Sequence, residues 1–198
     1  MCIRNIKDFE MNTIIENNKI WQNAVMLSVK AHRFQTRKDG VTPYVSHPMR
    51  VCLALSLIFD VHDPEILSAA LLHDVIEDTN VDFDDILEAC GREVASTVAL
   101  LSKDTRMEYE QREAMYKEQL ASASWKVKLI KIADIYDNIC DALVSRLGIN
   151  VWTPALNMIE DATGIPELCK AIEIISDLLK SLGAEKEWLD GTSRIGSI

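Results

Sequence analysis

The chain has 198 residues, of which 48% are hydrophobic, so we expect one domain, or one domain with a small appendage. Its formal net charge of −10 argues against binding to a nucleic-acid duplex, where neutralisation of phosphates dominates the affinity. No apolar run approaches the roughly 20 residues that span a bilayer, and the start lacks the pattern of a secretory signal. Five cysteines without a CxxC pair agree with reduced thiols, so the sequence predicts a cytoplasmic protein with no membrane partner.

The first third of the chain is predicted to contain two helices and a loop. Apolar residues at helical spacing predict an amphipathic helix over 14–34. Residues 36–46 are expected to form a loop, because they contain an Asp-Gly turn signal and a Thr-Pro pair. A second helix is predicted from His47 to about Phe59, with Ser46 as its N-cap.

The middle of the chain contains the most apolar predicted helix. Asp63-Pro64 is a strong helix start, and the helix is expected to continue to about Asp78. It is apolar almost all round until His73, so we predict that it is the central buried helix. The remaining helices are predicted at about 82–89, 92–102, 110–121, 125–147, 153–162 and 166–182. No strand alternation is found, so the fold class is predicted to be all-α.

An adjacent His73-Asp74 pair lies deep in this apolar helix. Burying both side chains without partners is costly, and ligation of a metal would satisfy them. Glu77 and Asp78 follow four residues after His73 and Asp74, so a single helical turn would bring the four polar groups together. Acids at a helix C-terminus oppose the helix dipole, which favours a nearby cation.

A second buried acid, Asp134, follows the apolar stretch VKLIKIA. Asn138 and Asp141 lie four and seven residues further on, and therefore on the same face of the predicted helix. This face resembles the wall of a site more than a core stripe. Lys131 lies three residues before Asp134 and is able to reach the same place.

Three segments together resemble the HD-domain phosphohydrolases: HPMRV, ALLHDVIEDT and KIADIYDN. The resemblance implies that His47, His73, Asp74 and Asp134 bind one divalent metal ion. Two imidazoles and two carboxylates without thiolates suit Mn²⁺ or a similar ion. The implied fold is a single HD-domain helical bundle, with a hydrolase core at 24–147, an extension and first-helix start at 1–23, and extra helices at 148–198 packed on the core.

Over roughly residues 24–141, the order of the motifs is similar to that of the hydrolase domain of RelA/SpoT homologues, and especially of their small single-domain relatives. The resemblance implies a hydrolase that removes the 3′-diphosphate from the alarmone ppGpp, usually with manganese. Glu77 is our first choice for the group that orients or deprotonates the attacking water, with Asp78 as acid, base or supporting carboxylate. The residues that we predict to bind the substrate are Arg37, Lys38, Lys131 and Asn138.

Two departures from the family pattern leave the substrate open. Cys140 stands where many relatives have an arginine, and residues 135–137 replace the more usual basic-Leu-aromatic run. The alternatives are therefore an HD phosphatase of another nucleotide, such as an NADPH-like dinucleotide or a nucleoside monophosphate, and a non-catalytic nucleotide sensor. A small-molecule nucleotide is the expected partner in each case, and assembly into a homo-oligomer stays open.

Overall fold

The computed structural model describes residues 18–145 and 164–181, and all the regular elements within them are helices. The only paired extended backbone in this part of the chain is an isolated bridge between Thr36 and Pro43. The helices are 18–31, α2 Ser46–Leu57, α3 Pro64–Leu72, α4 Val75–Asp78, α5 Phe83–Cys90, α6 Arg92–Leu101, α7 Tyr109–Ser122, α8 Trp125–Ser145 and α10 Pro166–Ser181. The predicted all-α fold class is confirmed.

Most predicted helices are found within a few residues of their expected bounds, but two details were wrong. Ser46 is the first residue of α2 and not its N-cap, because the backbone already turns at Tyr44, whose carbonyl accepts the amide of His47. The helix predicted to run to Asp78 ends at Leu72, and α4 begins at Val75. The helix predicted at 153–162 lies outside the described residues.

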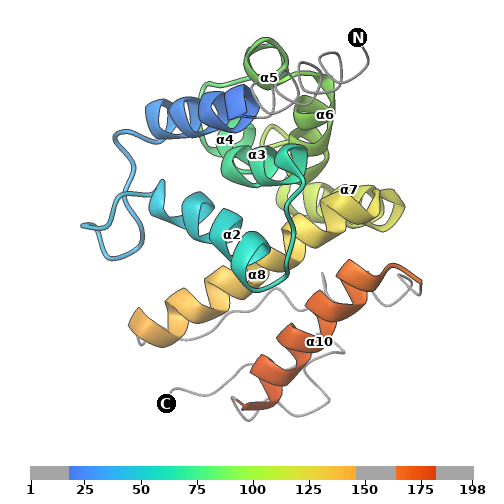
Figure 1. The fold of residues 1–198 in the computed structure, drawn as a ribbon. Helices are drawn as coiled ribbons and strands as arrows, with labels where there is room; N and C mark the ends of the chain where they lie inside the picture. The colour runs from blue at the N-terminus through green and yellow to red at the C-terminus, as the bar shows by residue number, and fades with distance from the viewer. Residues whose placement is uncertain (1–17, 146–163, 182–198) are drawn as a thin grey trace, which may run out of the picture.

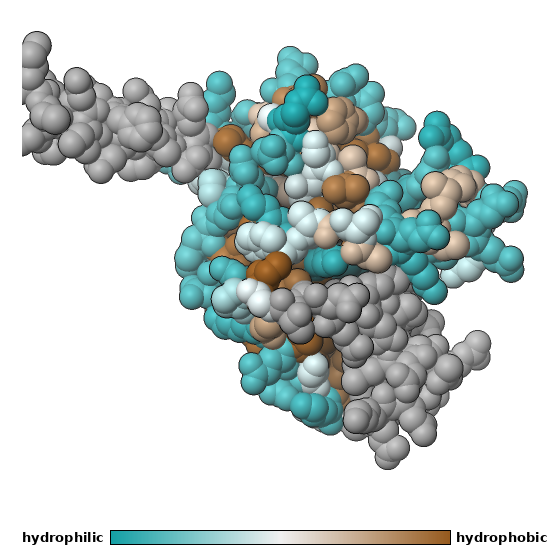
Figure 2. Space-filling model, turned by 90° about the vertical axis from the view of Figure 1, so that its right-hand side faces the viewer, coloured by the Kyte–Doolittle hydropathy of each residue, from teal (hydrophilic) through white to brown (hydrophobic). Residues whose placement is uncertain are grey.

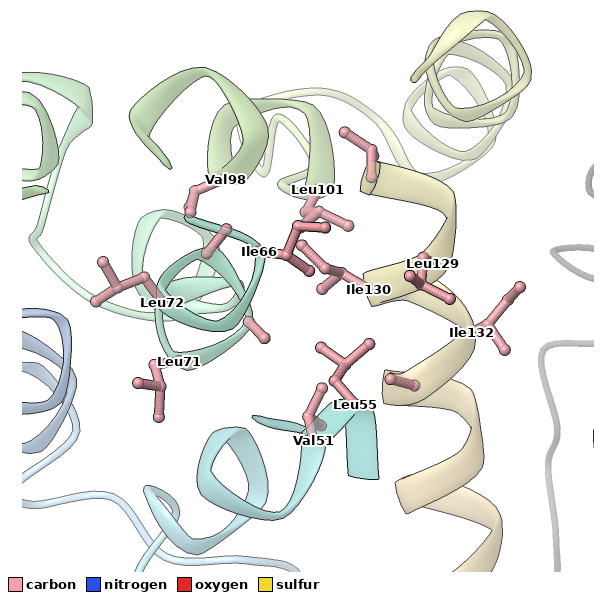
Figure 3. Packing of buried hydrophobic residues seen from close by; sticks show 14 of the residues in the cluster. Val51, Leu55, Ile66, Leu71, Leu72, Val98, Leu101, Leu129, Ile130 and Ile132 are labelled. Atoms are coloured by element: carbon pink, nitrogen blue, oxygen red, sulfur yellow. The ribbon is translucent and has the colours of Figure 1, made fainter. Parts of the chain in front are cut away.

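Helix α8 is the centre of the described fold. It packs against α2, α3 and α6 on one side and against α10 on the other (Figure 1). Figure 3 shows the result for neighbouring side chains: Ile130 points toward Leu55 and Ile66, whereas Ile132 points to the opposite side of the helix. Both isoleucines are fully buried, which explains why this helix is apolar on more than one face.

The first helix closes the core from the amino-terminal side. Ala24 is completely buried, and the Asn23 side chain donates a hydrogen bond to the carbonyl of Ala89 at 2.7 Å. The Cys90 thiol reaches the carbonyl of Ile20 at 3.7 Å. Helix 18–31 is therefore attached to the end of α5 by polar as well as apolar contacts.

Polar side chains start two of the helices. Asp63 accepts hydrogen bonds from the first amides of α3, as its Asp-Pro start predicts. Asp82 and Asp85 form a reciprocal capping box at the start of α5.

On the face shown in Figure 2, hydrophilic side chains dominate the described surface and apolar ones appear only in small groups. Within the described residues, no helix has the length and apolar character needed to span a membrane.

Leu55 provides a test of this packing. We expect Leu55→Ala to lower the free energy of unfolding by about 2–5 kcal/mol, because the side chain is fully buried between helices. Leu57→Ala on the same helix is the matched control, since Leu57 is 77% exposed and its removal should cost less than about 0.5 kcal/mol. Urea unfolding measures both. Equal losses for the two variants would contradict the packing of α2.

Candidate active site

The break between α3 and α4 places His73 and Asp74 at the site. His73 ends α3, and its Nδ1 donates a hydrogen bond to the carbonyl of Ala70 at 2.8 Å. A carbonyl only accepts hydrogen bonds, so Nδ1 holds a proton and the neutral ring presents the lone pair of Nε2. Nε2 is buried and forms no hydrogen bond within the described structure. The ring is therefore oriented as a metal-ligating histidine requires.

His47 is oriented by a carboxylate on α8. Its Nδ1 lies 2.7 Å from Oδ2 of Asp137, and its Nε2 lies 3.1 Å from Oδ1 of Asp134. The carboxylate of Asp137 accepts the Nδ1 proton, so Nε2 of a neutral His47 also presents a lone pair. His47 is 2% exposed, and its position on the first turn of α2 depends on the contact between α2 and α8.

Four donor atoms converge between these helices. Atoms of His47, His73 and Asp134 lie within 4.8 Å of one another. Asp74 completes the group, because its Oδ2 lies 3.1 Å from Nε2 of His73 and 3.6 Å from Nε2 of His47. The structure thus brings together the four residues that were predicted as metal ligands, although they come from three distant parts of the sequence.

The acids dominate the electrostatics of this group. Burial alone would lower the pKa of His47, but the hydrogen bonds to Asp134 and Asp137 outweigh it and raise the pKa to about 9. Burial alone would also lower the pKa of His73, but the negative charges of Asp74 and Asp134 together raise it. Burial disfavours the charged forms of Asp74 and Asp134, yet neighbouring cationic side chains hold the pKa of both carboxyls below the usual range. The site therefore has a strong preference for positive charge.

A divalent cation fits this donor set. Two imidazole nitrogens with fixed tautomers and two ionised carboxylates are ligands that divalent metals accept. The buried Nε2 of His73 meets no hydrogen-bond geometry in the described structure, although Oδ2 of Asp74 lies 3.1 Å away, so a cation between the two atoms would satisfy both. Because the histidines attract protons in this environment, a metal ion has to displace those protons when it binds.

Lys131 and Asn138 flank Asp134 on α8. Lys131 Nζ lies 2.7 Å from Oδ2 of Asp134. Burial alone would lower the pKa of Lys131, but its ion pair with Asp134 and the other acidic groups nearby together raise it. Asn138 donates from Nδ2 to Oδ1 of the same carboxylate at 2.6 Å. These two of the four predicted substrate-binding residues therefore contact a predicted metal ligand and help to fix its orientation.

Arg37 lies over the edge of the site and is held by α8. Its Nη2 donates to Oδ2 of Asp141 at 2.7 Å and to Oδ1 of Asn138 at 3.2 Å. Its guanidinium carbon lies 5.6 Å from the centre of the Tyr44 ring. The structure does not bring Lys38 into this cluster, because Lys38 is exposed in the turn that precedes Gly40.

Glu77 and Asp78, the predicted catalytic acids, have different partners. Oε2 of Glu77 accepts the backbone amide of Lys103 at 3.1 Å, and burial raises the pKa of this carboxyl. Burial also raises the pKa of Asp78, whose Oδ2 lies 2.9 Å from the Tyr44 hydroxyl. The same hydroxyl lies 2.7 Å from Oδ2 of Asp74, so Tyr44 connects Asp78 to the donor group. Glu77 is attached to the loop after α6 instead.

Sequence reasoning missed three residues that support the site: Tyr44, Arg50 and Asp137. Arg50 donates from Nε to Oδ1 of Asp137 at 2.7 Å and from Nη2 to Oδ2 at 2.9 Å. The spacing in the sequence could have identified Arg50 and Asp137. Arg50 follows His47 by three residues and Asp137 follows Asp134 by three, which places each pair on one helix face. Tyr44 had a weaker signal, namely its place in the loop directly before α2.

Comparisons with known proteins identify relatives of this chain. The model of the HD domain family matches residues 24–142. Guanosine-3′,5′-bis(diphosphate) 3′-pyrophosphohydrolase MESH1 of Drosophila melanogaster is 41% identical over 115 residues, which cover 58% of this chain and 64% of that protein. The bifunctional (p)ppGpp synthase/hydrolase SpoT of Escherichia coli is 34% identical over 120 residues, which cover 57% of this chain and 16% of that protein.

A solved structure has the same fold. It is that of a metazoan orthologue of SpoT described as hydrolysing ppGpp, and it superposes with a TM-score of 0.69 at 29% sequence identity. The superposition covers 83% of this chain and 96% of the other. In sequence, the matched stretch spans slightly less than two thirds of the length of the curated MESH1 relatives.

Proposed function

This chain belongs to the HD domain family, and from that premise we propose that it is a metal-dependent phosphohydrolase that removes the 3′-diphosphate of guanosine 3′,5′-bis(diphosphate). The observation that carries the proposal is the convergence of two histidines and two aspartates, to which Arg37 is linked through Asn138. Support for the substrate comes from the MESH1 and SpoT relatives, which are named for hydrolysis of this nucleotide.

His47, His73, Asp74 and Asp134 would hold one divalent metal ion, for which we propose Mn²⁺. Such an ion, when bound, polarises a phosphoryl oxygen and lowers the pKa of a water ligand. The donor set of two nitrogens and two oxygens supports the choice, since manganese accepts imidazole and carboxylate ligands. In the neutral form of either histidine, the hydrogen bond at Nδ1 holds the proton there and leaves Nε2 available for ligation.

Glu77 is proposed as the general base. A carboxylate that takes the proton of the attacking water allows the new P–O bond to form while the bond between phosphorus and the ribose 3′-oxygen breaks. Burial raises the pKa of Glu77, which makes it a better proton acceptor than an ordinary glutamate. Asp78 has a supporting part through the Tyr44 hydroxyl, which it shares with Asp74.

Arg37, Lys38, Lys131 and Asn138 are proposed to bind the nucleotide. Arg37 offers a planar guanidinium that binds phosphate with two hydrogen bonds, and Asp141 and Asn138 hold it at the site. Lys131 adds a buried positive charge beside Asp134. Lys38 is exposed in the loop before α2 and is proposed to reach the nucleotide from there.

A release assay tests the proposal. Purified protein with Mn²⁺ and ppGpp is expected to release pyrophosphate and a nucleoside 5′-diphosphate in equal amounts. The exchange is balanced, since one water is consumed and the 3′-hydroxyl is regenerated. Absence of release with Mn²⁺, Mg²⁺ and Co²⁺ across pH 6–9 would contradict the proposal. One equivalent of metal and tight nucleotide binding without turnover would identify a nucleotide sensor instead.

A second candidate function keeps the chemistry and changes the nucleotide. Asp137 lies in the segment 135–137 that departs from the family pattern, and it binds Arg50 beside the site. This local difference favours a panel that includes NADPH and nucleoside monophosphates, read as phosphate against pyrophosphate. In each case we place the protein in the cytoplasm, which agrees with free thiols at Cys52, Cys90 and Cys140.

A further inference from the structure

We propose that Asp137 is a positioning residue for the metal centre, and that Arg50 holds its carboxylate in place against Nδ1 of His47. The inference rests on the metal site of the proposed function but concerns residues that neither the motifs nor the comparisons assign. It predicts that metal affinity depends on a carboxylate which does not itself ligate the metal.

The contacts of Asp137 support its role in orienting His47. Its Oδ2 lies 2.7 Å from Nδ1 of His47, on the side of the ring opposite to the donor group. Its carboxylate is only 5% exposed, and it has no direct contact with the Nε2 atoms of the site in the described contacts. A carboxylate in this place fixes the tautomer and the plane of a ligating imidazole, and it increases the basicity of the ligating nitrogen.

Arg50 holds the carboxylate of Asp137 in place, because a buried carboxylate needs a partner. The guanidinium contacts both oxygens of Asp137, at 2.7 and 2.9 Å, so the pair is bidentate. Arg50 also lies 3.2 Å from Oδ1 of Asp141, whose other oxygen binds Arg37. A charged chain therefore runs from the proposed nucleotide-binding arginine to the far side of His47.

Helix geometry explains why these residues meet. Arg50 and His47 lie one turn apart on α2, and Asp137 and Asp134 lie one turn apart on α8. The two helices pack against each other, so one carboxylate of α8 faces each ring nitrogen of His47. Asp134 takes the side toward the metal site, and Asp137 takes the other side.

The test is a titration of metal-free protein with Mn²⁺, in which the electron paramagnetic resonance signal of unbound Mn²⁺ is measured at each step. Asp137→Asn keeps the size of the side chain and loses the charge, and we expect it to weaken Mn²⁺ binding about 10- to 100-fold. Asp137→Ala should weaken binding at least as much, and Arg50→Lys by less. For hydrolysis of ppGpp, the variants should need more Mn²⁺ for half-maximal rate, and excess Mn²⁺ should restore most of kcat.

Two controls separate positioning from general effects of charge. Asp141→Asn removes a carboxylate from the same arginine but not from His47, so its Mn²⁺ affinity should stay within about threefold of the wild type. Asp60→Asn alters a histidine–aspartate pair at the surface, where both side chains are more than 70% exposed, and should also leave the affinity unchanged. Thermal unfolding of the metal-free variants reports on folding.

Each outcome decides between the hypotheses. Wild-type protein that binds no Mn²⁺ would overturn the metal site and this inference together. Wild-type binding with unchanged affinity in folded Asp137→Asn and Asp137→Ala variants would overturn the positioning role alone. An equal loss in Asp141→Asn would also overturn it, because the effect would then come from the charge around Arg50. If the Asp137 variants fail to fold, the folded Arg50→Lys variant decides by the same criterion.

Discussion

Asp74→Ala is expected to abolish tight Mn²⁺ binding and to lower kcat/KM for phosphohydrolysis at least about 10³-fold. The physical reason is that Oδ2 of Asp74 lies within 3.6 Å of the Nε2 atoms of His47 and His73, the two nitrogens proposed as ligands, and supplies one of the two negative charges at the donor group. A metal ion stabilises the charge of the transition state by several kcal/mol, and about 4 kcal/mol corresponds to three orders of magnitude in rate. Elemental analysis after dialysis measures the bound metal directly.

Metal-linked stability gives a second readout for the same variant. A ligand that binds only the folded protein raises the melting temperature, so Mn²⁺ should stabilise the wild type and leave Asp74→Ala unchanged. Asp84→Ala is the matched control, because Asp84 is exposed in the first turn of α5 and lies outside the donor group. Stoichiometric Mn²⁺ and wild-type rates in Asp74→Ala would contradict the proposed ligand set.

Helical periodicity predicted most of the fold because each helix carries a local signal. Asp63-Pro64 and Asp82 mark helix starts that the structure confirms. The break at His73-Asp74 had no such signal, since the apolar pattern continues in phase from α3 into α4. The break coincides with a hydrogen bond from Nδ1 of His73 to the carbonyl of Ala70, and His73 and Asp74 form a turn before α4 begins at Val75.

In the candidate site, too, the residues that could be predicted are those with a local sequence pattern, and the residues that were missed have partners far away along the chain. His73 and Asp74 were found because polar neighbours in an apolar helix are conspicuous in the sequence. The partners of Tyr44, Arg50 and Asp137 lie 30 to 90 residues away along the chain, so no local pattern connects them. Their places depend on how α2 packs against α8, which a single sequence does not specify.

The second large effect is expected for Glu77. We predict that Glu77→Gln lowers kcat about 10²- to 10⁴-fold, the range typical of a general base, while Mn²⁺ affinity changes less than about threefold. Glutamine is able to accept the amide of Lys103 as Glu77 does, so the loop after α6 should keep its place. The variant removes the proton acceptor and leaves the four donor side chains intact.

The pH dependence of kcat distinguishes a base from a residue that only shapes the site. Burial raises the pKa of Glu77, so its carboxylate becomes protonated, and stops accepting protons, at a higher pH than an exposed glutamate would. The wild-type rate should therefore fall as the pH is lowered through this raised pKa, and the residual rate of Glu77→Gln should lack that limb. Glu88→Gln, at an exposed position of α5, should keep the wild-type profile. If Glu77→Gln kept the rate and Asp78→Asn lost it, the base would be Asp78, and the Tyr44 hydroxyl that joins it to Asp74 would belong to the proton path.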